Sequence, residues 1–252
     1  MKRIGRIVGL VLVVAPLALG CGSTPKLTPP IPTGTLSLIS SHPLNLLDAS
    51  GLTFNDSITT LWTVSDQPGR CVYQLDTLGN TVKKLDYVGE DVEGIAYDRS
   101  DTSLWVIEEG RREVVHLNLK GAVLSRTAIG LSGAPNSGLE GICLDHDGHM
   151  FVLNQKDPGL FVELNPDHSI ASQRTITFAR GFNDIASSRQ ANDFWIVSSL
   201  SKELFLWNKL TGVVREYPLT SPKPEGVSVD EASNRVYVVS DSTNTLYVYK
   251  MQ

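Results

Sequence analysis

The sequence repeats one pattern five times, and this repeat limits the possible folds more than any other feature. Each repeat opens with a polar residue, in most cases followed by glycine, and then an apolar strand. The five opening residues are Ser50, Glu93, Glu140, Asn183 and Glu225, spaced by 43, 47, 43 and 42 residues. Repeats of this length that contain several short antiparallel strands are typical of β-propeller blades.

The inner layout of each repeat predicts strands and no helix. A polar turn follows the opening segment, then an apolar strand, a second turn and a strand of more alternating character. These runs are rich in β-branched and aromatic residues and are bounded by Gly, Asp, Asn and Ser, which marks them as strands. Trp62, Trp105 and Trp195 recur at one position of the apolar strand. We expect them to pack between blades and not to form a sugar-binding platform.

The last repeat reaches Gln252 after three strands, while residues 35–39 form a spare strand at the other end of the domain. We expect this N-terminal strand to complete the last blade, because pairing it there removes an open sheet edge. The sequence therefore predicts an all-β domain over residues 35–252, a propeller of five four-stranded blades. Six blades is the alternative, if residues 35–49 contribute more than one strand.

The first 20 residues have the features of a signal peptide. Lys2, Arg3 and Arg6 precede an apolar run over residues 7–19. That run is shorter than the roughly 20 residues that a membrane-spanning helix needs. A basic start, a short apolar segment and small residues at its end are typical of export signals.

Ala18-Leu19-Gly20-Cys21 resembles the bacterial lipobox, although Ala18 and Leu19 are exchanged relative to the usual order. We expect Cys21 to be lipidated and residues 21–34, which contain four prolines, to form a tether. The alternative is an ordinary secretory signal. Lipidation would make the membrane a partner and place the protein in the bacterial cell envelope, facing the periplasm or the exterior. The residue directly after Cys21 is Gly22 and not Asp, which favours the outer membrane.

Charge and cysteine content narrow the possible partners. The chain has 22 Lys and Arg and 27 Asp and Glu, and removal of residues 1–20 leaves 19 against 27, a net charge of −8. This balance argues against nucleic-acid binding, which requires a basic surface. Cys71 and Cys143 fall in apolar strands of different repeats. We expect buried thiols there and a monomeric protein.

In a propeller the first strand of each blade lines the central channel, so residues that open this strand lie at one channel mouth. The ends of the second strands approach the same mouth. Several carboxylates crowded there would repel each other unless a cation or a proton intervenes. Oxygen ligands suit Ca²⁺ or Mg²⁺, and not Zn²⁺. The candidate metal ligands are Glu93, Glu140, Glu225, Asp66, Glu109 and Asp241, and the candidate ligand-binding residues are Ser50, Asn183 and Asn154, beside Gln155 and Ser199.

A structural role for the same glutamates is the alternative. A Glu at the start of a blade can accept hydrogen bonds from backbone N–H groups of the next blade, and the following Gly allows the backbones to approach closely. Both interpretations remain open from the sequence.

Residues 145–149 look like the start of a calcium loop, but the twelfth position is Lys156, where a bidentate Glu is needed. We therefore predict a β-hairpin turn at this position. The sequence has no Gly-x-Ser-x-Gly elbow, zinc-protease motif, phosphate-binding loop or dinucleotide fingerprint.

The opening segments resemble the SdiA-regulated (YjiK-like) family of exported propellers from about residue 36 to the end. The matching pieces include Glu93-Gly-Ile-Ala-Tyr-Asp98, Gly138-Leu-Glu-Gly-Ile142 and Pro224-Glu-Gly-Val227, while Asn183-Asp184 departs from the Glu-Gly pattern. The resemblance implies a propeller with a divalent cation, Ca²⁺, near its axis, and it implies no particular reaction.

Two functions follow from these observations. The first is a membrane-anchored binding or scaffold module for an unidentified protein or small molecule. The second is a metal-dependent hydrolase of lactones or phosphoesters, with Glu93 or Glu140 as general base. A fold of this kind hosts both classes of function, so the fold does not decide between them.

Overall fold

The computed structural model describes residues 30–67, 70–131 and 137–252. A compact unit, Ile31–Gln252, contains all the strands. The predicted signal peptide and the lipidation site Cys21 lie outside the described residues. Within the described residues, no helix is long and apolar enough to cross a membrane.

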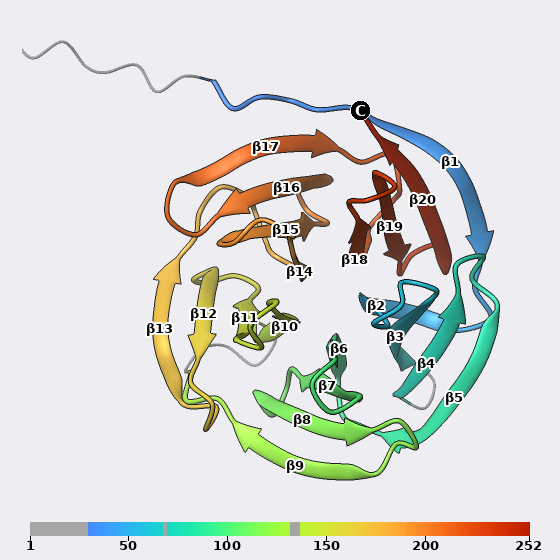
Figure 1. Cartoon of the computed structure of the whole chain (residues 1–252), viewed down its shortest axis with the longest axis vertical. Coiled ribbons are helices and arrows are strands. Elements are labelled where there is room, and N and C mark those ends of the chain that lie inside the picture. Colours follow the sequence, from blue (N-terminus) through green and yellow to red (C-terminus); the bar gives the residue numbers. More distant parts are fainter. Residues whose placement is uncertain (1–29, 68–69, 132–136) are drawn as a thin grey trace, which may run out of the picture. The chain divides into compact units, whose positions relative to one another are not determined.

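Five four-stranded antiparallel sheets stand around a common axis, as Figure 1 shows. The prediction of an all-β propeller with five blades is thereby confirmed, and the six-blade alternative is wrong. Blade 1 contains β2 (Leu47–Phe54), β3 (Thr60–Gln67), β4 (Cys71–Asp76) and β5 (Thr81–Val88). Blade 2 contains β6 (Val92–Asp98), β7 (Ser103–Glu108), β8 (Glu113–Asn118) and β9 (Val123–Ala128).

The remaining blades follow the same order from the axis outward. Blade 3 contains β10 (Leu139–Leu144), β11 (Met150–Asn154), β12 (Leu160–Leu164) and β13 (Ile170–Thr175). Blade 4 contains β14 (Asp184–Ser187), β15 (Asp193–Ser198), β16 (Glu203–Asn208) and β17 (Gly212–Pro218). Blade 5 contains β18 (Pro224–Asp230), β19 (Arg235–Ser240), β20 (Thr245–Met251) and β1 (Leu36–Pro43).

The N-terminal strand closes the ring, as predicted. β1 pairs antiparallel with β20 from Leu36 opposite Met251 to Pro43 opposite Thr245, with a register shift after Leu38. The strand is longer at its C-terminal end than the predicted residues 35–39. Because its partner comes from the other end of the chain, the first and last strands of the domain hold each other in place (Figure 1).

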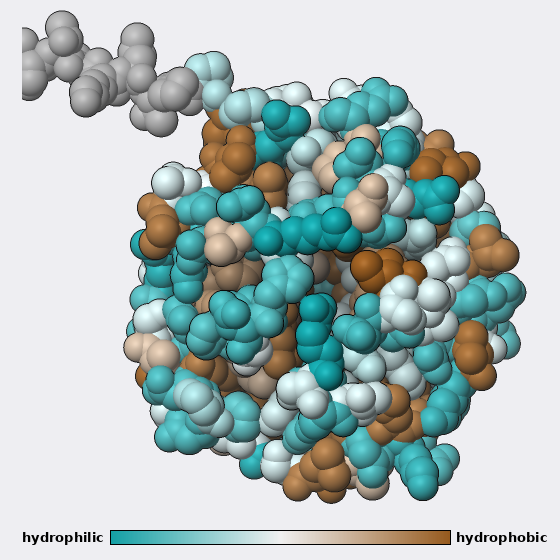
Figure 2. All heavy atoms as spheres, viewed as in Figure 1, coloured by the Kyte–Doolittle hydropathy of each residue, from teal (hydrophilic) through white to brown (hydrophobic). Residues whose placement is uncertain are grey.

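Apolar side chains pack mainly between adjacent blades. Trp62 of blade 1 packs in one cluster with Ile95 and Val106 of blade 2, and Trp195 of blade 4 packs with Val238 of blade 5. Trp62 and Trp195, like Trp105, are buried, in agreement with the predicted inter-blade core. The face in Figure 2 is mostly hydrophilic, with separate apolar patches. Cys71 and Cys143 are both buried, also as predicted.

Candidate metal centre at the channel mouth

The opening residue of four blades lies in a β-bulge. The pairing register shifts between Ser50 and Leu52, between Val92 and Ile95, between Leu139 and Ile142, and between Pro224 and Gly226. A bulge adds one residue to the strand and redirects a side chain that would otherwise follow the alternation of the sheet.

The glycines that follow these residues are required by close packing between inner strands. A Cβ on Gly94 would lie 2.3 Å from the carbonyl oxygen of Glu140 in the next blade, and a Cβ on Gly51 would lie 2.6 Å from the carbonyl oxygen of Glu93. No side chain fits at such distances, so the repeated Gly permits the inner strands of neighbouring blades to meet backbone to backbone.

The inner strands surround a cavity of about 570 Å³ at the mouth of the channel. Five blades contribute to its wall, and most side chains are acidic or polar. Of the residues singled out from the sequence, the cavity is lined by Glu93, Glu140, Glu225, Asp66, Asp241, Ser50, Asn183, Gln155 and Ser199. Asp48, Lys156 and Lys223 complete the polar lining.

Glu109 and Asn154 are not among the residues that line the cavity. Oε1 of Glu109 accepts a hydrogen bond of 2.8 Å from the backbone N–H of Gly138, so this side chain ties blade 2 to the segment that leads into blade 3. Asn154 donates to the carbonyl oxygens of Lys156 and Pro158 at 3.0 and 2.8 Å and holds the turn between β11 and β12. Glu109 thus makes the kind of contact that the sequence left as an alternative for the glutamates, whereas Asn154 holds a turn of its own blade.

Three carboxylates gather at one corner of the mouth. One oxygen from each of Asp66, Asp91 and Glu93 lies within 4.8 Å of the others. Oδ1 of Asp66 is buried and has no hydrogen-bond partner among the described residues, and Arg70 Nε lies 3.6 Å away from it. The sequence analysis missed Asp91. Asp91 precedes β6 with a left-handed backbone, φ of 55°, and a bulge follows it, so strand alternation gave no signal for its position.

Burial and the charges of neighbouring carboxylates raise the pKa of Glu93 and of Glu140. Burial is the main cause that raises the pKa of Glu93 to about 8, and the charges of Asp66 and Asp91 add to it. A hydrogen bond of 2.6 Å from Ser50 Oγ to Glu93 Oε2 acts in the opposite direction. The pKa of Glu140 is raised well above its usual value, first by burial and then by the charges of Glu93 and Glu109.

Lysines and amides hold the other side of the mouth. Burial raises the pKa of Glu225 to about 7, although the Lys223 ammonium and the Asn183 amide favour its charged form. Lys223 Nζ lies 3.7 Å from Glu225 Oε1 and also contacts Asp241. The Asn183 amide group donates to Glu225, and its Oδ1 accepts from the backbone N–H of Ser199 at 2.8 Å. The mouth therefore has an acidic corner and a side where carboxylates are partly neutralised.

Ser50 and Asn183, which open the two blades without glutamate, have the same role. Each donates a hydrogen bond to the opening glutamate of the following blade, Ser50 to Glu93 and Asn183 to Glu225. A family model described as SdiA-regulated matches residues 38–250. The chain belongs to the SdiA-regulated family.

Solved structures of low sequence identity share the fold of this SdiA-regulated protein. Glutaminyl cyclase of Myxococcus xanthus superposes with a TM-score of 0.69 at 15% identity, over 88% of this chain and 99% of that one. A gluconolactonase of Xanthomonas campestris superposes with a TM-score of 0.57 at 12% identity, over 86% of this chain and 99% of that one. Virginiamycin B lyase of Staphylococcus aureus superposes with a TM-score of 0.51 at 15% identity, over 80% of this chain and 66% of that one.

Blade 4 of the SdiA-regulated protein departs from the repeat at Asp184. This residue stands where the other blades have glycine, and its side chain is fully buried. Oδ2 accepts hydrogen bonds from the backbone N–H of Leu52 in blade 1, at 3.0 Å, and of Val227 in blade 5, at 2.9 Å. Burial raises its pKa to about 8. Asp184 thus joins three blades at the axis, beyond the residues that line the mouth.

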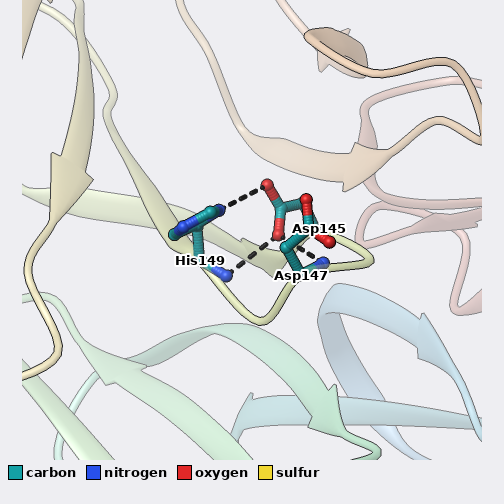
Figure 3. A group of neighbouring side chains, drawn as sticks. All are labelled: Asp145, Asp147 and His149. Carbon is teal, nitrogen blue, oxygen red and sulfur yellow. Dashed lines mark hydrogen bonds and ion pairs between the residues drawn. The ribbon is translucent and has the colours of Figure 1, made fainter.

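A second group of potential ligands, Asp145, Asp147 and His149, lies in the hairpin between β10 and β11 (Figure 3). Oδ1 of Asp145 accepts the backbone N–H groups of Asp147 and His149, both at 2.9 Å, and Oδ2 lies 3.1 Å from His149 Nδ1. These contacts hold the turn together, as the predicted hairpin requires. The group is largely exposed, and its central carboxylate is already used by the turn.

Proposed function

We propose that the acidic corner of the channel mouth binds a divalent cation. The observation that supports it is the close approach of oxygens from Asp66, Asp91 and Glu93, one of them buried without a hydrogen-bond donor. Like charges at such distances destabilise the protein unless a cation or protons compensate them. A cation would give Asp66 Oδ1 a direct contact in addition to its 3.6 Å ion pair with Arg70, and would relieve the repulsion within the group.

The chemistry of the donors favours Ca²⁺. All three side chains offer carboxylate oxygens, and Ca²⁺ takes six to eight oxygen ligands in flexible arrangements. Neither a thiolate nor an imidazole lines this mouth among the described residues, and those are the ligands expected for Zn²⁺. Three carboxylates leave coordination positions for water or for an oxygen of a bound molecule.

The cavity supports a binding function for the domain. Lys156 and Lys223 line the same cavity as the acidic corner. A small molecule with a carboxylate or phosphate group could therefore contact the cation with one oxygen and a lysine with another. We propose a module that binds such a ligand in a cation-dependent manner.

Thermal unfolding tests the cation site. At a Ca²⁺ concentration about 100 times the Kd, binding adds about 2.7 kcal/mol to the free energy of unfolding. For a domain of this size that is a rise in Tm of roughly 5–10 °C. We expect Asp66→Asn and Glu93→Gln to remove most of this rise, and Glu140→Gln to reduce it.

Asp147→Asn is the matched control, because it removes one carboxylate from the exposed hairpin group and leaves the mouth intact. Its Tm is expected to rise with Ca²⁺ as in the unmodified protein. An unchanged Tm of the unmodified protein over all Ca²⁺ concentrations, or a rise lost only in Asp147→Asn, would contradict a cation site at the mouth.

A metal-dependent hydrolase is the second candidate, and the environment of Glu140 favours it. Burial raises the pKa of this cavity carboxyl well above its usual value, and a carboxyl group with a raised pKa is suited to general acid–base catalysis. The substrate classes are lactones and phosphoesters. Turnover of one of these with Ca²⁺ present, lost in Glu140→Gln, would support the hydrolase; an inactive protein across the panel would support the binding module.

We further propose that the protein is a lipoprotein of the bacterial cell envelope, anchored through Cys21 and with the outer membrane favoured. The support is the lipobox-like Ala18-Leu19-Gly20-Cys21 after an apolar run. Acyl chains contribute about 0.8 kcal/mol per buried CH₂, so several chains on one cysteine hold a protein on a membrane. Cys21→Ser is expected to move the protein from the membrane fraction to the soluble fraction, and unchanged fractionation would refute the anchor.

A further inference from the structure

The channel has a second mouth, at the other end of the inner strands, with a different chemical character. A cavity of about 250 Å³ opens there. On each inner strand its wall uses residues that follow the repeated glycine, or Asp184 in blade 4, whereas the acidic mouth uses residues that precede this position. Asp184, which lines neither cavity, links blades 4, 5 and 1 between them.

The repeat itself builds this cavity. Two residues after the glycine or Asp184, every blade has a small side chain, and these five line the cavity: Thr53, Ala96, Cys143, Ala186 and Ser228. The next residue of most blades is larger and forms the wall: Phe54, Tyr97, Leu144 and Val229. Small residues near the axis leave the space open, and the larger ones give it an apolar surface able to contact a ring or a short acyl chain.

Two guanidinium groups stand at the rim. Arg99 Nε lies 3.8 Å from Asp56 Oδ1, a pair with both side chains mainly exposed and therefore weakly held. Arg99 Nη1 also lies 3.4 Å from His146 Nδ1. In the described part of the chain, the guanidinium of Arg189 has no ion pair within 4.0 Å.

Two acidic residues line this cavity, Asp56 and Glu231, and the second is already engaged. Glu231 Oε1 accepts from Ser188 Oγ and Trp195 Nε1, both at 2.7 Å, and Oε2 accepts from the backbone N–H of Arg189 at 3.2 Å. Its charge is thus directed to donors of blade 4. The Arg189 guanidinium is therefore available to an anion, and that of Arg99 becomes available when the anion displaces the exposed carboxylate of Asp56, in contrast to the acidic mouth.

A strained residue stands at the same rim. Ile58 lines the cavity with φ of 56°, a left-handed conformation that is rare for a β-branched residue. Asn55 holds its loop, since Oδ1 accepts the backbone N–H groups of Thr59 and Thr60, both at 3.0 Å. The same hairpin is also left-handed at Thr102, Asn192 and Asn234 of other blades, so this conformation belongs to the turn; in blade 1 it presents an apolar side chain, 38% exposed, at the rim.

We propose that this second mouth binds a small amphipathic anion, an organic acid with an aromatic or short acyl body. The apolar body contacts Phe54, Leu144 and Val229, and the carboxylate pairs with Arg99 and Arg189. Guanidinium groups suit this role because they bind carboxylates through two parallel hydrogen bonds. The site is separate from the proposed cation site, and neither depends on the other.

Calorimetric titration of the full chain without divalent cations tests the proposal, with phenylacetate as probe. Phenylacetate is expected to bind one site per chain. Phenylacetamide keeps the ring without the charge and acetate keeps the charge without the ring, so each is expected to bind at least about tenfold more weakly. The double variant Arg99→Gln/Arg189→Gln, changed at exposed positions, is expected to weaken phenylacetate binding by about tenfold or more.

Lys223→Gln is the matched control, because it removes a cation from the acidic mouth and leaves the second mouth intact. It is expected to bind phenylacetate as the unmodified protein does. The absence of saturable binding at about 10 mM phenylacetate would overturn the proposal. So would binding that is lost in Lys223→Gln and kept in the arginine double variant, because the anion would then lie in the acidic mouth.

Discussion

Asp184 replaces the glycine of the other four blades and supplies with its side chain what those blades obtain by backbone contact. Its carboxyl group accepts hydrogen bonds from the backbone N–H groups of Leu52 in blade 1 and Val227 in blade 5, the two blades that meet where the ring closes. A buried N–H group without an acceptor costs about 1–3 kcal/mol. A single side chain therefore satisfies two backbone N–H groups of two other blades at the axis.

The raised pKa of Asp184 predicts a pH-dependent stability. Burial raises the folded-state pKa to about 8 from the usual 3.8, so the folded protein favours the neutral carboxyl. The contribution to stability is complete below pH 3.8 and is lost as the pH rises through about 8. We expect the free energy of unfolding to fall less between pH 5 and pH 8 in Asp184→Asn than in the unmodified protein, measured by denaturant unfolding in EDTA.

Asp184→Ala is the companion variant, since it removes the acceptor of both N–H groups and is expected to destabilise the protein by about 2–5 kcal/mol at pH 5. An Asn variant with the same pH dependence as the unmodified protein would show that another carboxyl, such as Glu93 or Glu225, dominates the effect.

At the scale of the strand, the bulge and the glycine together explain why the acidic residues reach the channel mouth. The bulge redirects the side chain of the opening residue, and the glycine admits the backbone of the next inner strand. Both features belong to the same two residues of the repeat. The Glu-Gly pair therefore shapes the packing of the inner strands, and its glutamate is also a candidate ligand.

Gly94→Ala tests this packing. The added Cβ would lie 2.3 Å from the backbone oxygen of Glu140, so the inner strands of blades 2 and 3 must separate. We expect a loss of about 1–3 kcal/mol in the free energy of unfolding and a weaker Ca²⁺ effect. Gly130→Ala is the control, because nothing lies within 4 Å of its Cβ position. Equal stability of the two variants would contradict the close-approach explanation.

At the scale of the whole molecule, stability depends on the pairing of the two ends of the domain. β1 covers β20, which would otherwise be an exposed edge strand with a full row of unpaired backbone groups. The contact between residues so distant in sequence forms only when the other blades are in place. We therefore attribute the integrity of the ring to this strand pair.

Truncation tests the closure. A chain that starts at residue 44 lacks β1 and is expected to aggregate or to melt at a clearly lower temperature. A peptide with residues 36–43, added in excess, is expected to restore the soluble monomer. A chain that starts at residue 30 keeps β1 and is the control. Size-exclusion chromatography separates these outcomes, and a stable monomeric chain without residues 36–43 would refute the closure role.

The spacing of the repeat was sufficient to predict the class of fold, the number of blades and the strand that closes the ring. Strand periodicity reports which residues share a face, and an almost constant repeat length requires equivalent positions around an axis. For this reason Glu93, Glu140 and Glu225 could be assigned to one mouth before any coordinates were known.

Only the tertiary structure decided which side chains meet. Asp91, at the start of blade 2, approaches Asp66 of blade 1. Glu109 and Asn154 turn to backbone partners, and Asp184 reaches two other blades at the axis. These outcomes depend on bulges, loop conformations and the direction of individual side chains, which act over a few ångströms. A repeat pattern specifies the position of a residue along its strand, but the contacts between strands of different blades arise only when the ring has closed.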